Sequence, residues 1–170
     1  GYYVFPGGRV DAADARAIPA RPMRSDVLSM VSRSCSTARA RALAMAAVRE
    51  TFEETGLILG GAIPDPASNP RQPAAWSHFL DTGKAADLGN LDYVARAITP
   101  AQSPIRFDGR FFVTDGERAE GELGGSGELE ELAWRSLADT MSLPLVDITE
   151  FLLGEYLPKY LDAPASRDPN

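Results

Sequence analysis

Residues 46–57, AAVRETFEETGL, constrain the fold of this chain more than any other segment. Alanine and unbranched side chains favour a helix, and Gly56 can adopt the left-handed conformation that ends one. Glu50, Glu53 and Glu54 have the spacing i, i+3, i+4, so their carboxylates share one face of the helix. The sequence therefore predicts the end of a helix that presents three like charges side by side.

Three neighbouring carboxylates destabilise a helix and raise each other's pKa unless a cation lies between them. Mg²⁺ and Mn²⁺ prefer carboxylate oxygens as ligands, so a divalent metal site is one interpretation of the triplet. A solvated acidic helix end is the other interpretation. The triplet alone does not decide between them.

A turn-forming Pro-Gly-Gly at positions 6–8 lies upstream of this helix. Together the two segments resemble the Nudix box, the loop–helix–loop signature of the Nudix hydrolases. Its positions are filled by Gly8, Asp14, Arg49, Glu50, Glu53, Glu54, Gly56 and Leu57. Asp14 stands where the family has glutamate, and Thr51 stands where it has an apolar residue.

The box is interrupted. Thirty-four residues, 15–48, separate Asp14 from Arg49, where the family pattern has seven, so 27 residues are inserted. We place the insertion at 15–41 and call the interrupted motif the split box. The insertion holds six arginines and one acid, Asp26. It is interpreted either as a solvated surface excursion or as a basic flap that binds a polyphosphate ligand.

Two downstream segments, ARAITP at 95–100 and RFDGRFF at 106–112, look like a second signature. With the split box they resemble the branch of the family that includes peroxisomal acyl-coenzyme A diphosphatases and many uncharacterised bacterial relatives. The resemblance covers most of the chain.

Local patterns predict the elements that carry these motifs. A cap at Ser36 or Thr37 begins the helix that runs to Thr55, and a second helix is expected at 74–81. Strands are expected at 1–5, 91–99, 106–114 and 128–135, the second and third as an antiparallel pair. A capping-box pattern at 147–150 begins an amphipathic closing helix.

The resemblance implies a fold class: α/β, with the Nudix α/β/α sandwich around a mixed central sheet, as a single Nudix domain over 1–170. Relatives normally carry strands before the position at which this chain starts, so the N-terminal strands are expected to be missing. An open sheet edge in their place predicts aggregation or a homodimer paired through that edge.

The resemblance also implies roles for the split box. Glu53 and Glu54 are the main metal ligands, Glu50 is a ligand or the general base, and the glycine backbone at Gly8 approaches the metal and phosphates closely. Arg49 orients a box carboxylate through an ion pair. A further acid supplies a ligand or the base, and its candidates are Glu128, Glu130 and Glu131, of which Glu128 is preferred. Asp14 has a side chain one carbon shorter than glutamate, which counts against its reaching the metal.

Five arginines are the candidate substrate-binding residues: Arg9, Arg21, Arg24, Arg106 and Arg110. Arg21 and Arg24 lie in the insertion, where arginine donors would match phosphate oxygens. For Arg106 and Arg110 the alternative is the polar face of a half-buried strand.

Composition excludes several classes of protein. A net charge of −7 argues against general nucleic-acid binding, which needs a basic surface. One cysteine excludes an internal disulfide and is typical of a reducing compartment. No apolar run reaches the ~20 residues of a membrane span, and no signal peptide is visible. We expect a cytoplasmic protein with a small-molecule partner.

The expected reaction is Mg²⁺- or Mn²⁺-dependent hydrolysis of a diphosphate linkage in a nucleoside-diphosphate derivative. Coenzyme A or its acyl thioesters are the leading substrate class. A nucleotide sugar or a dinucleoside polyphosphate is the first alternative. A Nudix module that binds a nucleotide without cleaving it is the second, although three intact box glutamates count against it.

Overall fold

A computed structural model describes residues 1–64, 72–102 and 106–162. They fall into two compact units, one formed by Pro6–Leu132 and the other by Gly1–Phe5 with the chain from Ala133 onward. The prediction of a single domain over 1–170 stays a prediction.

The longest element is helix α2, Thr37–Thr55. It begins as predicted, because the Ser36 side chain accepts a hydrogen bond from the Arg39 N–H at 3.2 Å. It ends as predicted at Gly56, whose φ of 74° lies in the left-handed region. Small and apolar side chains form its buried face: Ala40, Ala44, Met45, Val48 and Phe52.

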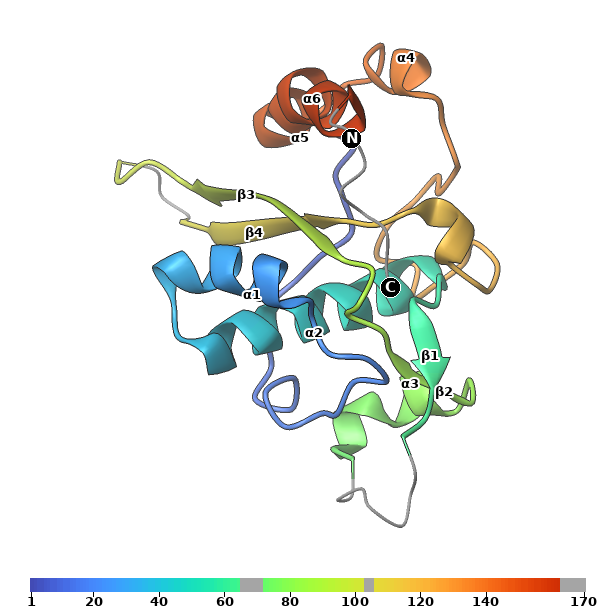
Figure 1. The fold of residues 1–170 in the computed structure, drawn as a ribbon. Helices are drawn as coiled ribbons and strands as arrows, with labels where there is room; N and C mark the ends of the chain where they lie inside the picture. The colour runs from blue at the N-terminus through green and yellow to red at the C-terminus, as the bar shows by residue number, and fades with distance from the viewer. Residues whose placement is uncertain (65–71, 103–105, 163–170) are drawn as a thin grey trace. The chain divides into compact units, whose positions relative to one another are not determined.

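The insertion in the split box packs into the core. It forms helix α1, Ser25–Val31, followed by a 3₁₀ turn, Ser32–Ser34. Val27 and Val31 are 0% exposed and join the same hydrophobic cluster as α2. Figure 1 shows α1 and α2 on the same side of the strand pair β3–β4. The solvated surface excursion was therefore the wrong interpretation for this helix.

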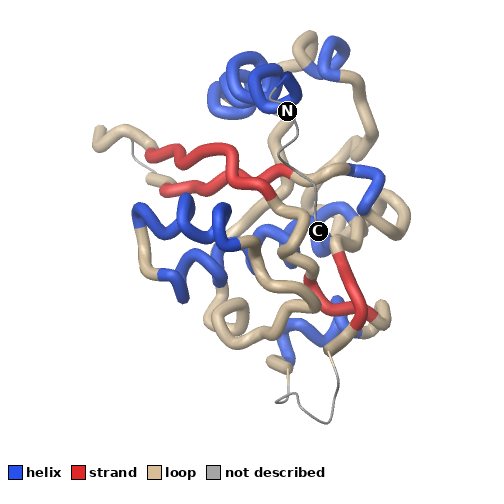
Figure 2. Tube along the Cα trace, in the orientation of Figure 1, coloured by secondary structure: helices blue, strands red, loops and turns tan. Residues whose placement is uncertain are grey.

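The described residues form two separate two-stranded antiparallel sheets (Figure 2). One pairs β1, Gly60–Ala62, with β2, Lys84–Ala86. The other pairs β3, Asp92–Ile98, with β4, Asp108–Val113, and confirms the predicted antiparallel pair. The sandwich around one mixed central sheet is not confirmed. The pair β1–β2 was not predicted, because glycine, alanine and lysine carry little strand signal.

The segment after β4 covers the C-terminal end of α2 instead of forming the strand predicted at 128–135. After a 3₁₀ turn, Gly116–Arg118, Glu120 makes an antiparallel bridge with Ile58. The N–H groups of Gly124 and Ser126 then donate to the carbonyls of Thr55 and Glu53, at 2.9 and 2.8 Å. These donors satisfy carbonyls that have no partner within the helix. The strand prediction was wrong: residues 128–135 form no strand, and the φ of 54° at Glu131 is incompatible with one.

The predicted helix at 74–81 is confirmed as a 3₁₀ turn, Ala74–Trp76, running into α3, Ser77–Leu80. Trp76 and Phe79 are buried, whereas the prolines and polar residues around them are not.

The second unit consists of short helices: α4, Leu137–Thr140; α5, Asp147–Phe151; a π-helical turn, Leu152–Tyr156; and α6, Leu157–Asp162. The strand predicted at 1–5 is reduced to a single parallel bridge between Tyr3 and Leu145. The capping box at 147–150 was also wrong, because Val146 holds the cap position and makes no side-chain cap bond. Within the described part of the chain, no helix has the length and apolar character needed to cross a membrane.

The burial of the insertion predicts its contribution to stability. Val31→Ala should lower the free energy of unfolding by about 1–3 kcal/mol, because it removes methyl groups from a closed core site. Met30→Ala on the same helix is the control, since Met30 is 37% exposed and its truncation leaves no cavity. Urea titration followed by circular dichroism measures both. Equal, small effects would contradict a core role for the insertion.

Candidate functional site

The split box is assembled around the guanidinium of Arg49, whose side chain is only 9% exposed. Its Nε and Nη2 donate to the two carboxylate oxygens of Asp14, at 2.9 and 3.1 Å. Its Nη1 donates to Glu53 Oε2 at 2.8 Å, and Nη2 lies 2.9 Å from Glu50 Oε1. Hydrogen bonding to Asp14 raises the pKa of Arg49 above its ordinary value, so this group stays cationic. The predicted ion pair between Arg49 and a box carboxylate is confirmed.

Three contacts hold the glycine loop against the last turns of α2. The Gly7 N–H donates to Glu54 Oε2 at 2.8 Å, and Arg49 Nη2 donates to the Arg9 carbonyl at 3.0 Å. The Glu50 carboxylate lies directly against the Gly8 α-carbon, so a β-carbon at this position would be 2.4–2.5 Å from it. Only glycine permits that approach. Backbone and carboxylate groups separated by the insertion are therefore in direct contact.

Asp14 faces Arg49 and is fully buried. Besides the two Arg49 donors, its carboxylate accepts from the Asp11 N–H at 2.8 Å and from the indole Nε1 of Trp76 at 3.2 Å. Four donors thus occupy the Asp14 carboxylate, two of them from Arg49. Asp14 is therefore the anchor of Arg49, and whether it reaches a metal stays a prediction.

The carboxylates of Glu50 and Glu54 have raised pKa values, because they are partly buried and lie close to other carboxylates. Burial raises the pKa of Glu50, and the Arg49 charge opposes this effect. Burial also raises the pKa of Glu54; the Gly7 N–H lowers it, whereas the charges of Glu50, Glu128 and Glu53 raise it further. Crowded, partly buried carboxylates are the oxygen donors that Mg²⁺ and Mn²⁺ take, and a divalent cation would offset their repulsion.

The donor chemistry fits a hard divalent cation, although the carboxylates do not converge as they stand. Among the residues described, no three His, Cys, Asp or Glu side chains form a ready-made metal cluster. Glu50 and Glu53 point to Arg49, and Glu54 points to Gly7. Each of these contacts uses one carboxylate oxygen of its glutamate, so the other oxygen is the one that would take part in a shared ion.

Glu128 lies on the loop that covers the end of α2, with its side chain exposed to solvent. Ser126, two residues earlier, donates its N–H to the Glu53 carbonyl, and its hydroxyl accepts from the Glu128 N–H at 3.4 Å. The structure thus brings Glu128 into the neighbourhood of the box glutamates, but from a loop and not from the strand on which it was predicted.

Three of the predicted substrate-binding arginines already have carboxylate partners. Arg21 pairs with Asp87 at 2.5 Å, and Arg24 pairs with Asp92 and, at 3.3 Å, with Asp26. These pairs join the insertion to the segment around β2 and β3. Hydrogen bonds to the partners raise the pKa of both arginines. The structure uses these two guanidinium groups to hold the insertion in place.

Arg110 has a comparable structural role on β4. It donates to Asp108 at 2.5 Å and to Ser34 Oγ at 3.2 Å. Together with Arg96 it holds the pKa of Asp108 well below its usual range. Ser34 precedes α2, whereas Glu50 lies 13 residues beyond Thr37, which is about 20 Å along a helix axis. Arg110 and the box carboxylates are therefore not brought together.

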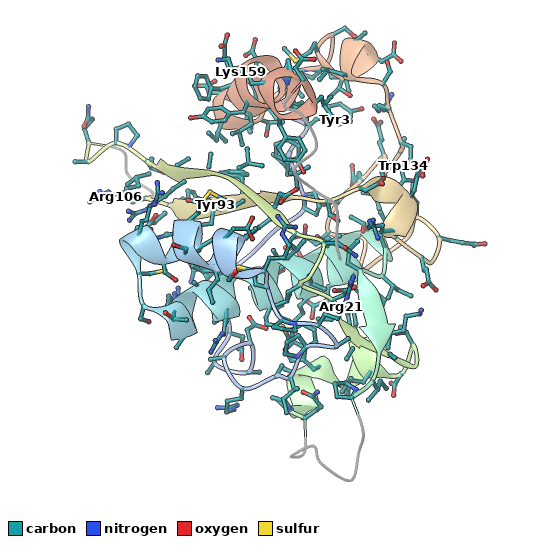
Figure 3. All side chains as sticks on the ribbon, in the orientation of Figure 1. Tyr3, Arg21, Tyr93, Arg106, Trp134 and Lys159 are labelled. Atoms are coloured by element: carbon teal, nitrogen blue, oxygen red, sulfur yellow. The ribbon has the colours of Figure 1, made fainter. Side chains whose placement is uncertain are left out.

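Arg9 and Arg106 are exposed, and neither makes an ion pair with a described residue. Arg9 starts from the glycine loop, so its side chain leaves the backbone beside the box carboxylates. Figure 3 shows Arg106 at the outer tip of the β3–β4 pair, well separated from Arg21. Of the five predicted arginines, Arg9 is the one that the fold places at the split box.

Sequence reasoning missed two groups in this site, the Gly7 N–H and the Trp76 indole. Trp76 lies in the helix expected at 74–81 and is buried there as an apolar side chain would be. A signal was present, since a buried indole N–H needs an acceptor. No local pattern, however, indicates which carboxylate that acceptor is.

Comparison with known proteins gave one informative result. No protein-family model matches the chain, and no curated protein matches it. Among solved structures, it is similar to the crystal structure of a NUDIX hydrolase from Alicyclobacillus acidocaldarius, with a TM-score of 0.61 and 32% sequence identity. The match covers 90% of this chain and 74% of that one.

The contact between Gly8 and Glu50 gives a direct test of the site geometry. Gly8→Ala should lower hydrolytic turnover on the order of 10- to 100-fold, because the methyl group displaces the Glu50 carboxylate. The melting temperature should change little, since the displaced atoms are the end of a flexible side chain. Gly154→Ala is the control, because its β-carbon would meet only Met141 at an ordinary 3.6 Å. Wild-type turnover in Gly8→Ala would contradict the close approach.

Proposed function

We propose that this chain, which belongs to the Nudix hydrolase family and hydrolyses phosphoanhydride bonds, is metal-dependent. Its proposed substrates are the diphosphate linkages of nucleoside-diphosphate derivatives. Coenzyme A or an acyl-coenzyme A is the proposed substrate class. The observation that carries the proposal is the Arg49 cluster, which gathers Glu50, Glu53 and the glycine loop at the end of one helix.

Glu50, Glu53 and Glu54, with the backbone of Gly8, would hold Mg²⁺ or Mn²⁺. When bound, such an ion neutralises phosphate charge and lowers the pKa of the attacking water. Water adds to one phosphorus of the P–O–P bridge, the bridging oxygen leaves with the other phosphate, and the water's protons pass to the site and the solvent.

The protein's own residues supply orientation and a proton acceptor. Arg49 fixes the direction of the Glu53 and Glu50 carboxylates, and the Gly7 N–H fixes Glu54. Glu50 or Glu128 accepts the proton from water. Glu128 is exposed at the edge of the cluster, which suits exchange of that proton with solvent.

The coenzyme A assignment is supported by the resemblance of 95–100 and 106–112 to the acyl-coenzyme A diphosphatase branch. Arg21, Arg24 and Arg110 add no support, since each is paired with a carboxylate. Arg9 is the arginine we propose for contact with substrate phosphate at the split box, and exposed Arg106 is a more distant candidate. Nucleotide sugars and dinucleoside polyphosphates are the alternative substrates.

Removal of the metal-ligand charge tests the chemistry. Glu53→Gln and Glu54→Gln should each lower the turnover number roughly 100-fold or more while the circular dichroism spectrum is retained, because each change preserves volume and removes a charged ligand. Exposed Glu117→Gln is the matched control. Near-normal turnover in both variants at saturating Mg²⁺ would remove these residues from the ligand set and would favour a different use of the box.

A panel of diphosphates tests the substrate. With Mg²⁺ or Mn²⁺, phosphate-monoester release should be greatest from coenzyme A or acyl-coenzyme A and should stop when EDTA removes the ion. Dephospho-coenzyme A should react with a similar specificity constant, within about threefold, because the insertion arginines that could recognise its missing phosphate are already paired. Preferential cleavage of a nucleotide sugar or dinucleoside polyphosphate would replace coenzyme A as the substrate class. Binding without cleavage would contradict the hydrolase assignment.

A further inference from the structure

We propose that Trp76 is a positioning residue of the hydrolytic site, whose indole N–H fixes the Asp14 carboxylate that in turn holds Arg49. The inference rests on the proposed hydrolysis and goes beyond the residues of the split box. Trp76 lies 62 positions from Asp14 in the chain, in the 3₁₀ turn that precedes α3. It is 2% exposed, and its Nε1 lies 3.2 Å from Asp14 Oδ1.

The donors around Asp14 show why this hydrogen bond matters. Oδ1 accepts from Arg49 Nε and Trp76 Nε1, and Oδ2 accepts from Arg49 Nη2 and the Asp11 N–H. A carboxylate has about four lone-pair sites, so these four donors saturate it. Because Asp14 is fully buried, no solvent water can replace a lost donor without an opening in the core.

A displacement of Asp14 would also move Glu50 and Glu53, because the rigid guanidinium of Arg49 contacts all three carboxylates. The guanidinium is planar and holds its donors in a fixed fork, so a rotation that follows Asp14 moves its other contacts as well. Those contacts are Glu53 Oε2, Glu50 Oε1 and the Arg9 carbonyl. Trp76 therefore affects the direction of two proposed metal ligands without touching either of them.

Packing explains how Trp76 keeps its own position. Its ring contacts Phe79 edge-on, with centroids 5.4 Å apart, and Phe79 contacts Phe52 of α2 at 5.1 Å. The aromatic group thus lies on the helix that carries the glutamates. Phenylalanine could fill much of the same space, but it has no N–H to donate to the buried Asp14 carboxylate, whereas the tryptophan indole does.

The test separates the N–H from the ring. Trp76→Phe should lower the turnover number about fivefold to tenfold, because a hydrogen bond to a buried charge is lost, while KM changes less than twofold. In an Asp14→Ala background, which has no acceptor for the indole N–H, the same substitution should have almost no further effect. A second variant, with benzothienylalanine at position 76, keeps the shape of the indole and replaces N–H by sulfur. It should reproduce the loss of turnover even if Trp76→Phe folds poorly.

Phe79→Leu is the control for packing, since leucine weakens the aromatic contact but keeps an apolar side chain against the Trp76 ring and removes no donor. It should lower the melting temperature and leave the turnover number within twofold of wild type. Full turnover in the benzothienylalanine variant, or equal losses from Trp76→Phe in the wild-type and Asp14→Ala backgrounds, would overturn the proposal.

A readout without substrate distinguishes this proposal from the proposed function. Calorimetric titration of Mn²⁺ into substrate-free protein should show an apparent Kd raised about threefold or more by the benzothienylalanine variant and unchanged by Phe79→Leu. If the wild-type protein binds Mn²⁺ but cleaves no diphosphate, the hydrolysis proposal fails while the positioning role is decided by this titration. An unchanged Kd in the variant would overturn the positioning role even if the hydrolase is active.

Discussion

The buried ion pair between Arg49 and Asp14 is the interaction on which the rest of the site depends. Removing one partner of such a pair leaves an unpaired charge in the core, at a cost of about 3–5 kcal/mol. The guanidinium also has donors that Asp14 does not take. They reach Glu53, Glu50 and the Arg9 carbonyl, so one cation orders two carboxylates and a loop. The proposed site and the core therefore share the same group.

The insertion does not disturb the Arg49–Asp14 pair, because its own core contacts and ion pairs hold it in place. Val27 and Val31 fill the core beside α2, and Arg21 and Arg24 pair with Asp87 and Asp92. Two of its six arginines are thus neutralised by carboxylates of the same unit. Arginine clusters in an acidic protein suggest phosphate binding when only their sequence is known. Here the pairing partners, which lie more than 60 residues away, change that interpretation.

In the segment that follows β4, the strand predicted from the sequence is absent. The resemblance of residues 128–135 to the family's last core strand predicted a strand there, yet the chain just before it bends over the end of α2 and donates to its last carbonyls. Glu131 adopts a φ of 54°, which is incompatible with a strand. Glu128 nevertheless comes close enough to Glu54 to raise its pKa. The structure therefore places Glu128 near the box glutamates, as expected, but on a loop and not on the predicted strand.

The amino-acid sequence by itself determined α2, from the Ser36 cap to Gly56, and the shared face of its glutamates, because caps and helical periodicity act within a few residues. It also contained the split box, since each half of the motif keeps its residue order on its own side of the insertion. Only the tertiary structure decided that Asp14 anchors Arg49, that Trp76 completes this anchor and that Arg21, Arg24 and Arg110 are paired. Those outcomes depend on partners up to 76 positions apart, and the choice among many chemically equivalent carboxylates and donors is made by packing, which no local pattern records.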